Sequence, residues 1–194
     1  MSSIRELKFV PKGKLWNRVQ ILDRASKTPL YTCTSAKLSK TITLHEGSSA
    51  NGRVLGAARI GYAKDIQLAL GDPTDLKCSW EIMRNTPRMT HTNNFEVALE
   101  DLQTNTKLSL RWKGTSAPRA SSLLSQYDTF HLKLVDTTDD SIIARFIHRS
   151  TSWLVMDGTL EIYREMGEEM EAAIVVMCAG ILKYQTYMWT GNIL

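Results

Sequence analysis

The stretch that decides the fold is Glu168-Glu169-Met170-Glu171-Ala172-Ala173-Ile174-Val175-Val176-Met177-Cys178-Ala179-Gly180-Ile181-Leu182-Lys183. In it, 11 consecutive apolar residues follow a group of glutamates and precede a lysine. Acidic side chains at the start of a helix and a basic side chain at its end interact favourably with the helix macrodipole. The stretch therefore predicts a helix. Because this helix is apolar on every face, it must be surrounded by protein or by lipid.

Two surroundings are open to such a helix. An apolar run of 11 residues is shorter than the run of about 20 that crosses a bilayer core, so we expect the rest of the chain to enclose it. The alternative is a C-terminal membrane anchor that continues through Tyr184, Tyr187, Met188 and Trp189. The polar side chains of Lys183, Gln185 and Thr186 argue against the anchor.

The chain ahead of this helix reads as short strands separated by turn residues. Residues 15–22 alternate large apolar and polar side chains, and the turn residues of 23–29 lead into a second strand at 30–34, which is typical of a hairpin. Further strands are predicted over 41–45, 53–60, 66–70, 78–83, 94–99, 107–112, 129–135, 142–147 and 159–163. Eleven or twelve short strands are typical of an all-β sandwich or barrel.

The composition is that of an ordinary globular protein. The chain has 194 residues, of which 43% are hydrophobic and three are cysteines. This length and composition exclude disorder and a disulfide framework. Cys33, Cys78 and Cys178 form no C-x-x-C pair, which predicts three reduced thiols in a cytoplasmic protein. The small-residue stretch 114–125 is predicted to be a surface loop, so a single domain is expected over 1–194.

The positive charge is concentrated in the first third of the chain. Residues 1–64 contain 12 Lys and Arg but 3 Asp and Glu, whereas residues 165–194 contain one Lys and four Glu. The net charge of +4 therefore conceals a local excess of +9. Concentrated positive charge attracts phosphates of lipid headgroups or of nucleic acid. The alternative is a solvated face that only keeps the protein soluble.

One candidate site for an anion is Arg111-Trp112-Lys113, with Arg119 in the following loop. Two cations beside an indole can hold a phosphate while the ring lies at a membrane interface or stacks on a base. The alternative is plain strand alternation, in which Trp112 faces inward and both charges face water.

A second candidate site comes from the basic N-terminal third. It comprises Lys12, Lys14 and Arg18, joined by Lys37 and Lys40 if their segment lies on a neighbouring strand. The spacing along the chain does not fix the distances between these side chains.

The residues that usually carry catalysis or bind metals are scattered. His45, His91, His131 and His148 stand in no metal-binding spacing, and no phosphate-binding glycine loop or nucleophile elbow occurs. Residues 136–140 contain three aspartates that could bind a metal, but an ordinary hairpin loop is the favoured interpretation. The glutamates of 165–171 could form a carboxylate pair, but stabilisation of a helix N-terminus accounts for them. We therefore expect no catalytic residues, no metal and no cofactor.

The end of the chain combines Asp157-Gly158-Thr159-Leu160-Glu161-Ile162 with Glu168-Glu169-Met170-Glu171-Ala172-Ala173-Ile174-Val175-Val176, followed by Ile181-Leu182-Lys183. This combination resembles the closing strand and helix of the tubby C-terminal-like superfamily, which includes tubby, the plant LURP-one-related proteins and phospholipid scramblases. It is closest to small fungal members of unknown function. It implies a mainly β fold, namely a closed antiparallel barrel of about twelve strands that encloses a hydrophobic C-terminal helix.

The resemblance also suggests a class of partner, because tubby binds phosphoinositides through Lys and Arg side chains. Together with the basic N-terminal third, it predicts a non-enzymatic domain that binds an anionic partner, such as a phosphoinositide-containing membrane surface. Such a protein would be cytoplasmic and peripheral to the membrane, and nucleic acid is not the expected partner. The alternatives are a protein–protein interaction scaffold, and an enzyme or small-ligand binder whose pocket is formed by distant loops.

Overall fold

The computed structural model describes residues 4–12, 17–36, 39–61, 64–87, 93–101, 106–115, 131–149 and 156–190. Within these residues the chain forms twelve strands and one helix. They are β1 (Arg5–Lys12), β2 (Arg18–Asp23), β3 (Pro29–Thr34), β4 (Thr41–Glu46), β5 (Val54–Ile60), β6 (Ile66–Leu70), β7 (Trp80–Pro87), β8 (Asn93–Asp101), β9 (Thr106–Thr115), β10 (His131–Asp136), β11 (Ile142–His148), β12 (Gly158–Ile162) and α1 (Glu168–Thr190). The predicted surface loop at 114–125 lies mostly outside the described residues.

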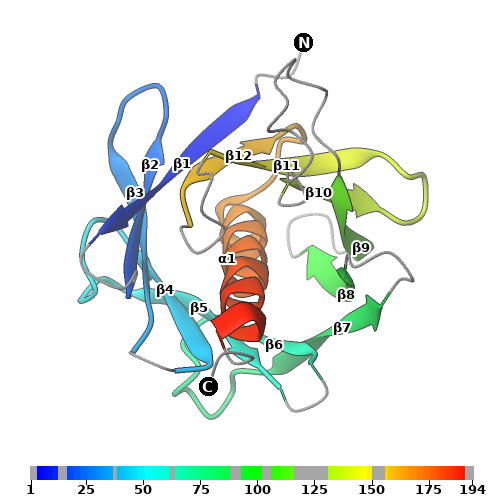
Figure 1. Cartoon of the computed structure of the whole chain (residues 1–194), viewed down its shortest axis with the longest axis horizontal. Helices are drawn as coiled ribbons and strands as arrows, with labels where there is room; N and C mark the ends of the chain where they lie inside the picture. Colours follow the sequence, from blue (N-terminus) through cyan, green and yellow to red (C-terminus); the bar gives the residue numbers. More distant parts are fainter. Residues whose placement is uncertain are drawn as a thin grey trace.

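The twelve strands form one closed antiparallel barrel, in which each strand pairs with its neighbours in the chain. The barrel closes where β1 pairs with β2 on one side and with β12 on the other (Figure 1). This confirms the predicted fold class. The strand β1 was not predicted individually, because Pro11 and several charged residues hide the alternation of Leu7 and Phe9, which are fully buried.

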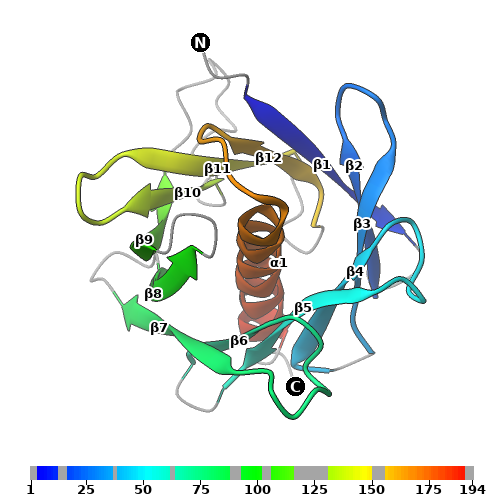
Figure 2. The same ribbon diagram turned by 180° about the vertical axis from the view of Figure 1, so that it is seen from behind.

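The helix α1 runs through the interior of the barrel, as both views show (Figure 1, Figure 2). Every residue of its apolar run, 172–182, is buried. The first turn carries the acidic residues Glu168, Glu169 and Glu171, as the macrodipole favours. The protein itself therefore surrounds the helix, as predicted. In the described part of the chain, no helix is both long and apolar enough to cross a membrane.

The helix packs against one side of the barrel, formed by β4, β5 and β6. Small residues make this close approach possible. A Cβ atom on Gly180 would lie 2.7 Å from the Cβ of Ala58, and one on Gly56 would lie 3.6 Å from the Cγ1 of Val176. Large side chains are buried on other strands, where Phe95 of β8 meets Tyr184 edge to face, with ring centroids 5.2 Å apart. Side-chain size thus sets where the helix lies.

We predict that Val175→Asp or Ile181→Asp prevents folding. Both side chains are fully buried, and an unpaired charge in the barrel interior costs several kcal/mol, of a total stability of about 5–15 kcal/mol. Circular dichroism and solubility would measure the loss. Ile82→Asp is the matched control, because Ile82 is 50% exposed. A folded, soluble Val175→Asp variant would show that the helix is not the core.

A second prediction concerns the contact of Gly180 with Ala58. In an exposed helix, Gly→Ala stabilises by about 1 kcal/mol. Here we expect Gly180→Ala to lower the free energy of unfolding by about 1–3 kcal/mol, because the new methyl group clashes with the Cβ of Ala58. In an Ala58→Gly background the same change should become stabilising. Denaturant unfolding of the four proteins measures this, and additive effects would contradict it.

Candidate functional site

The two ends of the barrel differ in what they carry. Because successive strands are antiparallel, the connections between them alternate between the ends. The helix begins at the end where β1 begins, since Arg5 pairs with Ile162, the last residue of β12. We call this the helix-start end. At the opposite end, the helix-exit end, β1 finishes at Lys12 and α1 leaves the barrel (Figure 1).

At the helix-start end, the arginines are neutralised within the protein. Arg5 Nη1 lies 2.6 Å from Asp23 Oδ2, and its Nε lies 3.3 Å from Glu171 Oε2. The hydroxyl of Tyr31 donates to Glu171 Oε1 at 2.7 Å. These bonds tie the first turn of α1 to β1, β2 and β3. Three further ion pairs at this end are Arg24–Glu6 at 2.5 Å, Arg53–Glu46 at 3.0 Å and Arg164–Asp136 at 3.6 Å.

A depression of about 470 Å³ lies at this end, lined by Ile4, Arg5, Glu6, Asp23, Arg24 and Ala25. Its charged side chains already pair with one another or with Glu171. It therefore offers little uncompensated charge to a ligand.

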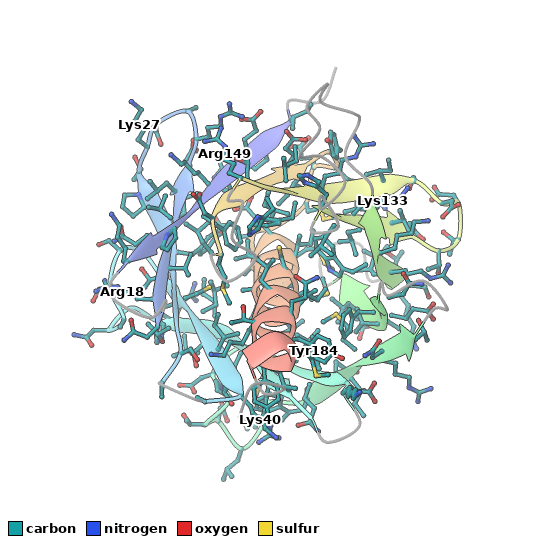
Figure 3. All side chains as sticks on the ribbon, in the orientation of Figure 1. Arg18, Lys27, Lys40, Lys133, Arg149 and Tyr184 are labelled. Atoms are coloured by element: carbon teal, nitrogen blue, oxygen red, sulfur yellow. The ribbon has the colours of Figure 1, made fainter. Side chains whose placement is uncertain are left out.

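At the helix-exit end, exposed cations surround the end of the helix. Lys12 is the last residue of β1, Lys64 lies between β5 and β6, and Arg149 directly follows β11. None of the three forms an ion pair with a described residue. Lys40 lies at the same end, with its Nζ 5.2 Å from the centre of the Tyr187 ring. Lys40 and Arg149 are labelled in Figure 3.

Hydrogen bonds fix the end of α1 in the mouth of the barrel. The amide of Asn85 on β7 donates from Nδ2 to the Tyr184 hydroxyl at 3.1 Å. The backbone N–H of Asn85 donates to Asp65 Oδ1 at 2.7 Å, so this carboxylate of the helix-exit end is engaged internally. Burial lowers the pKa of Lys183, the last charged residue of the described helix. The mouth thus combines fixed aromatic side chains with cations.

The structure brings together part of the predicted N-terminal cation group. Lys12 and Arg18 lie directly opposite each other on β1 and β2. The Arg18 side chain runs along the outer wall, where its Nη2 donates to the Ser48 carbonyl at 2.6 Å. Lys40 lies at the helix-exit end, while Lys14 and Lys37 fall outside the described residues. The cations of residues 1–64 do not form one face, because Arg5, Arg24 and Arg53 lie at the other end.

The other predicted anion site, Arg111-Trp112-Lys113, shows the plain alternation of a strand. Trp112 faces inward and is 1% exposed, and its Nε1 has no hydrogen-bond partner among the described residues. It cannot stack on a ligand outside the barrel. Arg111 and Lys113 face outward, and each meets a carboxylate: Arg111 Nε lies 2.7 Å from Glu96 Oε1, and Lys113 Nζ lies 3.2 Å from Asp140 Oδ1. Arg119 lies outside the described residues.

The candidate metal ligands do not gather. His45 is held by the Thr34 hydroxyl at 2.9 Å from its Nε2, and His131 Nδ1 accepts from the backbone N–H of His148 at 3.2 Å. His91 lies outside the described residues. Residues 137–141 form the β10–β11 hairpin turn, as favoured above. Among the described residues, no group of three His, Cys, Asp or Glu could hold a metal.

The cysteines are free thiols in the structure. Cys33 and Cys178 are buried, and burial raises the pKa of both. Cys78 is half-buried. The buried thiols are therefore protonated and serve as small apolar side chains of the core.

Comparisons with protein-family models, curated proteins and solved structures found no match for this chain.

Sequence reasoning missed two residues of the helix-exit end, Lys64 and Arg149. Lys64 is followed by Asp65, and Arg149 comes at the end of a predicted strand after His148, so no local run of cations marks either residue. A signal was nevertheless present. In an up-and-down barrel, every second connection lies at the same end, so the cations in alternate loops could have been grouped from the predicted strand order.

The network at the helix-start end gives a pH-dependent prediction. Tyr31→Phe should cost about 1.5–3 kcal/mol at neutral pH, because the hydroxyl bonds to a carboxylate. Burial and the bond to Glu171 raise the pKa of Tyr31 above its ordinary value of 10.0, so the folded state holds this proton more tightly. The contribution of the Tyr31 hydroxyl to the free energy of unfolding is therefore complete below pH 10 and falls as the pH rises further.

Denaturant unfolding of the wild type and of Tyr31→Phe, from pH 7 to pH 11, measures this contribution. The difference between the two proteins should narrow above about pH 10. A constant difference across that range would contradict the assignment.

Proposed function

We propose that this protein binds an anionic membrane surface through its helix-exit end. The observation that carries the proposal is the contrast between the two ends. At the helix-start end, Arg5, Arg24, Arg53 and Arg164 are each paired with carboxylates. The exposed lysines of that end, Lys27, Lys77 and Lys107, stand among exposed acids such as Asp75, Glu100 and Glu168. At the helix-exit end, Lys12, Lys64 and Arg149 are exposed and have no such partner among the described residues.

The chemistry of this end suits lipid headgroups. Each Lys or Arg close to an anionic membrane surface contributes about 1 kcal/mol of binding free energy. Cations on several connections around one barrel mouth can approach a flat surface together, which a row along one strand cannot do. The half-buried ring of Tyr187 lies beside Lys40 at the same end, and aromatic rings with a polar tip favour the headgroup level of a bilayer.

The opposite end supports a defined orientation on the membrane. The start of α1 and its surroundings carry the acidic residues Glu165, Glu168 and Glu169, all exposed. Like charge repels these carboxylates from an anionic surface. The protein would therefore dock with the helix-exit end toward the lipid. With its free thiols, the proposed location is the cytoplasmic face of a membrane.

Membership of the tubby C-terminal-like superfamily is part of the same proposal. What supports it is a twelve-stranded closed barrel with a hydrophobic C-terminal helix inside, as the resemblance implies. The preferred headgroup within that proposal is a phosphoinositide. The binding surface, however, is the helix-exit end rather than the whole basic N-terminal third.

A protein-interaction scaffold is the second candidate function. One observation favours it: Leu70, Leu76 and Ile82, which are 39%, 103% and 50% exposed, all belong to β6, β7 or the turn between them. Exposed apolar side chains on one part of the surface, here two paired strands and the turn between them, are typical of protein contacts. Under this alternative, polar substitutions of Leu76 and Ile82 would abolish the capture of a protein partner in a pull-down experiment. Substitution of the cations of the helix-exit end would leave that capture intact.

The triple variant Lys12→Gln/Lys64→Gln/Arg149→Gln tests the membrane proposal. We expect it to bind vesicles containing phosphatidylserine or phosphoinositide about 100-fold more weakly, at about 1 kcal/mol for each cation removed. Vesicle co-sedimentation over a series of salt concentrations measures the change. The matched control is Lys27→Gln/Lys77→Gln/Lys107→Gln, which removes the same charge from exposed lysines at the helix-start end.

The control variant should bind like the wild type, and neutral phosphatidylcholine vesicles should bind none of the proteins. If both triple variants lose affinity equally, net charge rather than the helix-exit end is responsible. If the wild type binds anionic and neutral vesicles equally poorly, the proposal is wrong.

A further inference from the structure

The pairing between β7 and β8 covers only part of these two strands. Arg84–Pro87 of β7 pair with Asn93–Glu96 of β8. Among the described residues, Trp80–Met83 of β7 pair only with β6, and Val97–Asp101 of β8 pair only with β9. Beyond their paired part the two strands diverge (Figure 1, Figure 2). We call the opening between Trp80–Met83 and Val97–Asp101 the split. It opens toward the helix-start end, where β7 begins and β8 ends.

On the β7 side, the backbone groups of two residues point into the split. Successive residues of a strand in an antiparallel sheet direct their N–H and C=O groups to opposite neighbours. The N–H of Asn85 points toward β6, because it donates to Oδ1 of Asp65, the residue before β6, at 2.7 Å. Met83 has the same phase and pairs with β6. Trp80 and Ile82 have the opposite phase, so their N–H and C=O groups point into the split.

On the β8 side, the same reasoning identifies two more residues. The carbonyl of Ser109 on β9 points toward β10, because it accepts from the N–H of Thr137 at 2.8 Å. The residue after Ser109 therefore points toward β8, where it pairs with Val97, so Val97 points toward β9. Ala98 and Glu100 have the opposite phase and point into the split. Backbone groups without a partner strand bond to water or to a strand that is added.

The side chains along the β7 edge of the split are apolar and accessible. Met83 is fully buried, so Trp80 and Ile82 face outward, and Ile82 is 50% exposed. Leu76, in the connection that leads into β7, is fully exposed. Edges that avoid pairing usually carry lysine or proline. The outward side chains of this edge instead suit the side chains of a neighbouring strand.

The charge at the split is negative. Glu81 on β7 and Glu100 on β8 are exposed, and neither forms an ion pair with a described residue. A basic side chain on whatever enters the split would interact favourably with these carboxylates.

We propose that the split binds an extended segment of a partner protein as an added β-strand. Main-chain hydrogen bonds to Trp80 and Ile82 would provide the affinity, and alternate side chains of the segment the specificity. The segment carries apolar side chains at the alternate positions beside Ile82, and a Lys or Arg within reach of Glu81 or Glu100. A lipid chain has no N–H or C=O groups to offer these edges. A second barrel would bring its whole wall to an edge that already faces β8, so a single strand is the occupant that fits.

This site does not rest on the proposed membrane function. The split opens toward the helix-start end, whereas Lys12, Lys64 and Arg149 lie at the helix-exit end. A protein docked on a membrane through its helix-exit end would keep the split accessible to a partner protein.

Hydrogen exchange of the free protein, followed by NMR residue by residue, tests whether the edge is open. We expect the amides of Trp80 and Ile82 to exchange at least about tenfold faster than those of Glu81 and Met83, which point toward β6. Equal protection of these four amides would overturn the proposal.

Proline substitutions test the direction of the backbone groups. Ile82→Pro removes an N–H that points into the split, whereas Arg84→Pro removes one that belongs to the pairing with Glu96. We expect Ile82→Pro to lower the melting temperature by less than half of the drop that Arg84→Pro causes. An equal or larger drop for Ile82→Pro would show that its N–H is part of the sheet, and would overturn the proposal.

A display library of seven-residue peptides supplies the binding probe, with counter-selection against Ile82→Pro. Fluorescence anisotropy measures the affinity of the enriched peptides. We expect Ile82→Pro to weaken binding at least about tenfold, and Ile82→Leu, which keeps the N–H, to bind like the wild type. N-methylation of the peptide backbone should weaken binding at least about tenfold at every second position, because those amides bond to the β7 edge.

The proposal is overturned if no peptide binds the wild type better than Ile82→Pro, or if N-methylation has no effect at any position. It is also overturned if the protein sediments as a dimer that Ile82→Pro converts to a monomer, since a second copy would then occupy the edge. Ile82→Pro should bind phosphatidylserine vesicles like the wild type, so failure of the split and failure of the proposed membrane function remain distinguishable.

Discussion

The structure depends on one constraint: a helix that is apolar on all faces must be kept from water. A single packed layer would cover only one side of such a helix, whereas a closed barrel covers all sides. Closure also removes the unpaired strand edges that an open sheet of this length would leave. The pairing of β1 with β12 is therefore as important to the helix as it is to the sheet, because it completes the enclosure.

The same constraint determines the size pattern of the core. The helix lies close to β4, β5 and β6, where Gly56 and Ala58 leave room for it. Other parts of the interior hold large side chains such as Trp112, Phe95 and Tyr184, all nearly inaccessible to solvent. If the helix moved away from Ala58 by the width of a methyl group, its packing against β4, β5 and β6 and its packing against the large side chains would both change. The reason is that protein interiors are packed as densely as organic crystals.

The sequence predicts the fold better than it predicts the candidate site, for a physical reason. A buried apolar run and alternating strands are local patterns, so α1 and most strands were predictable within a few residues. β1 was the exception, because Pro11 and charged neighbours obscure Leu7 and Phe9. A surface site in a barrel, in contrast, is assembled from separate connections and from cross-strand register. The split between β7 and β8 depends on where the pairing of two long strands stops, which no local pattern in the sequence specifies.

Because the interior of the barrel is filled, a ligand has fewer places at which it can bind. Barrels that carry small ligands keep an internal cavity for them, but here the barrel holds its own helix, and the residues of the apolar run are buried against the strands. Binding at the described residues must therefore use the outer wall or the ends. At the helix-start end the arginines are already paired, and one of those pairs, Arg5 with Glu171, also secures the helix. A ligand that took Arg5 from Glu171 would weaken the start of the helix on which the fold depends. The cations of the helix-exit end can bind an anion without that cost, which is why the anionic partner is proposed there.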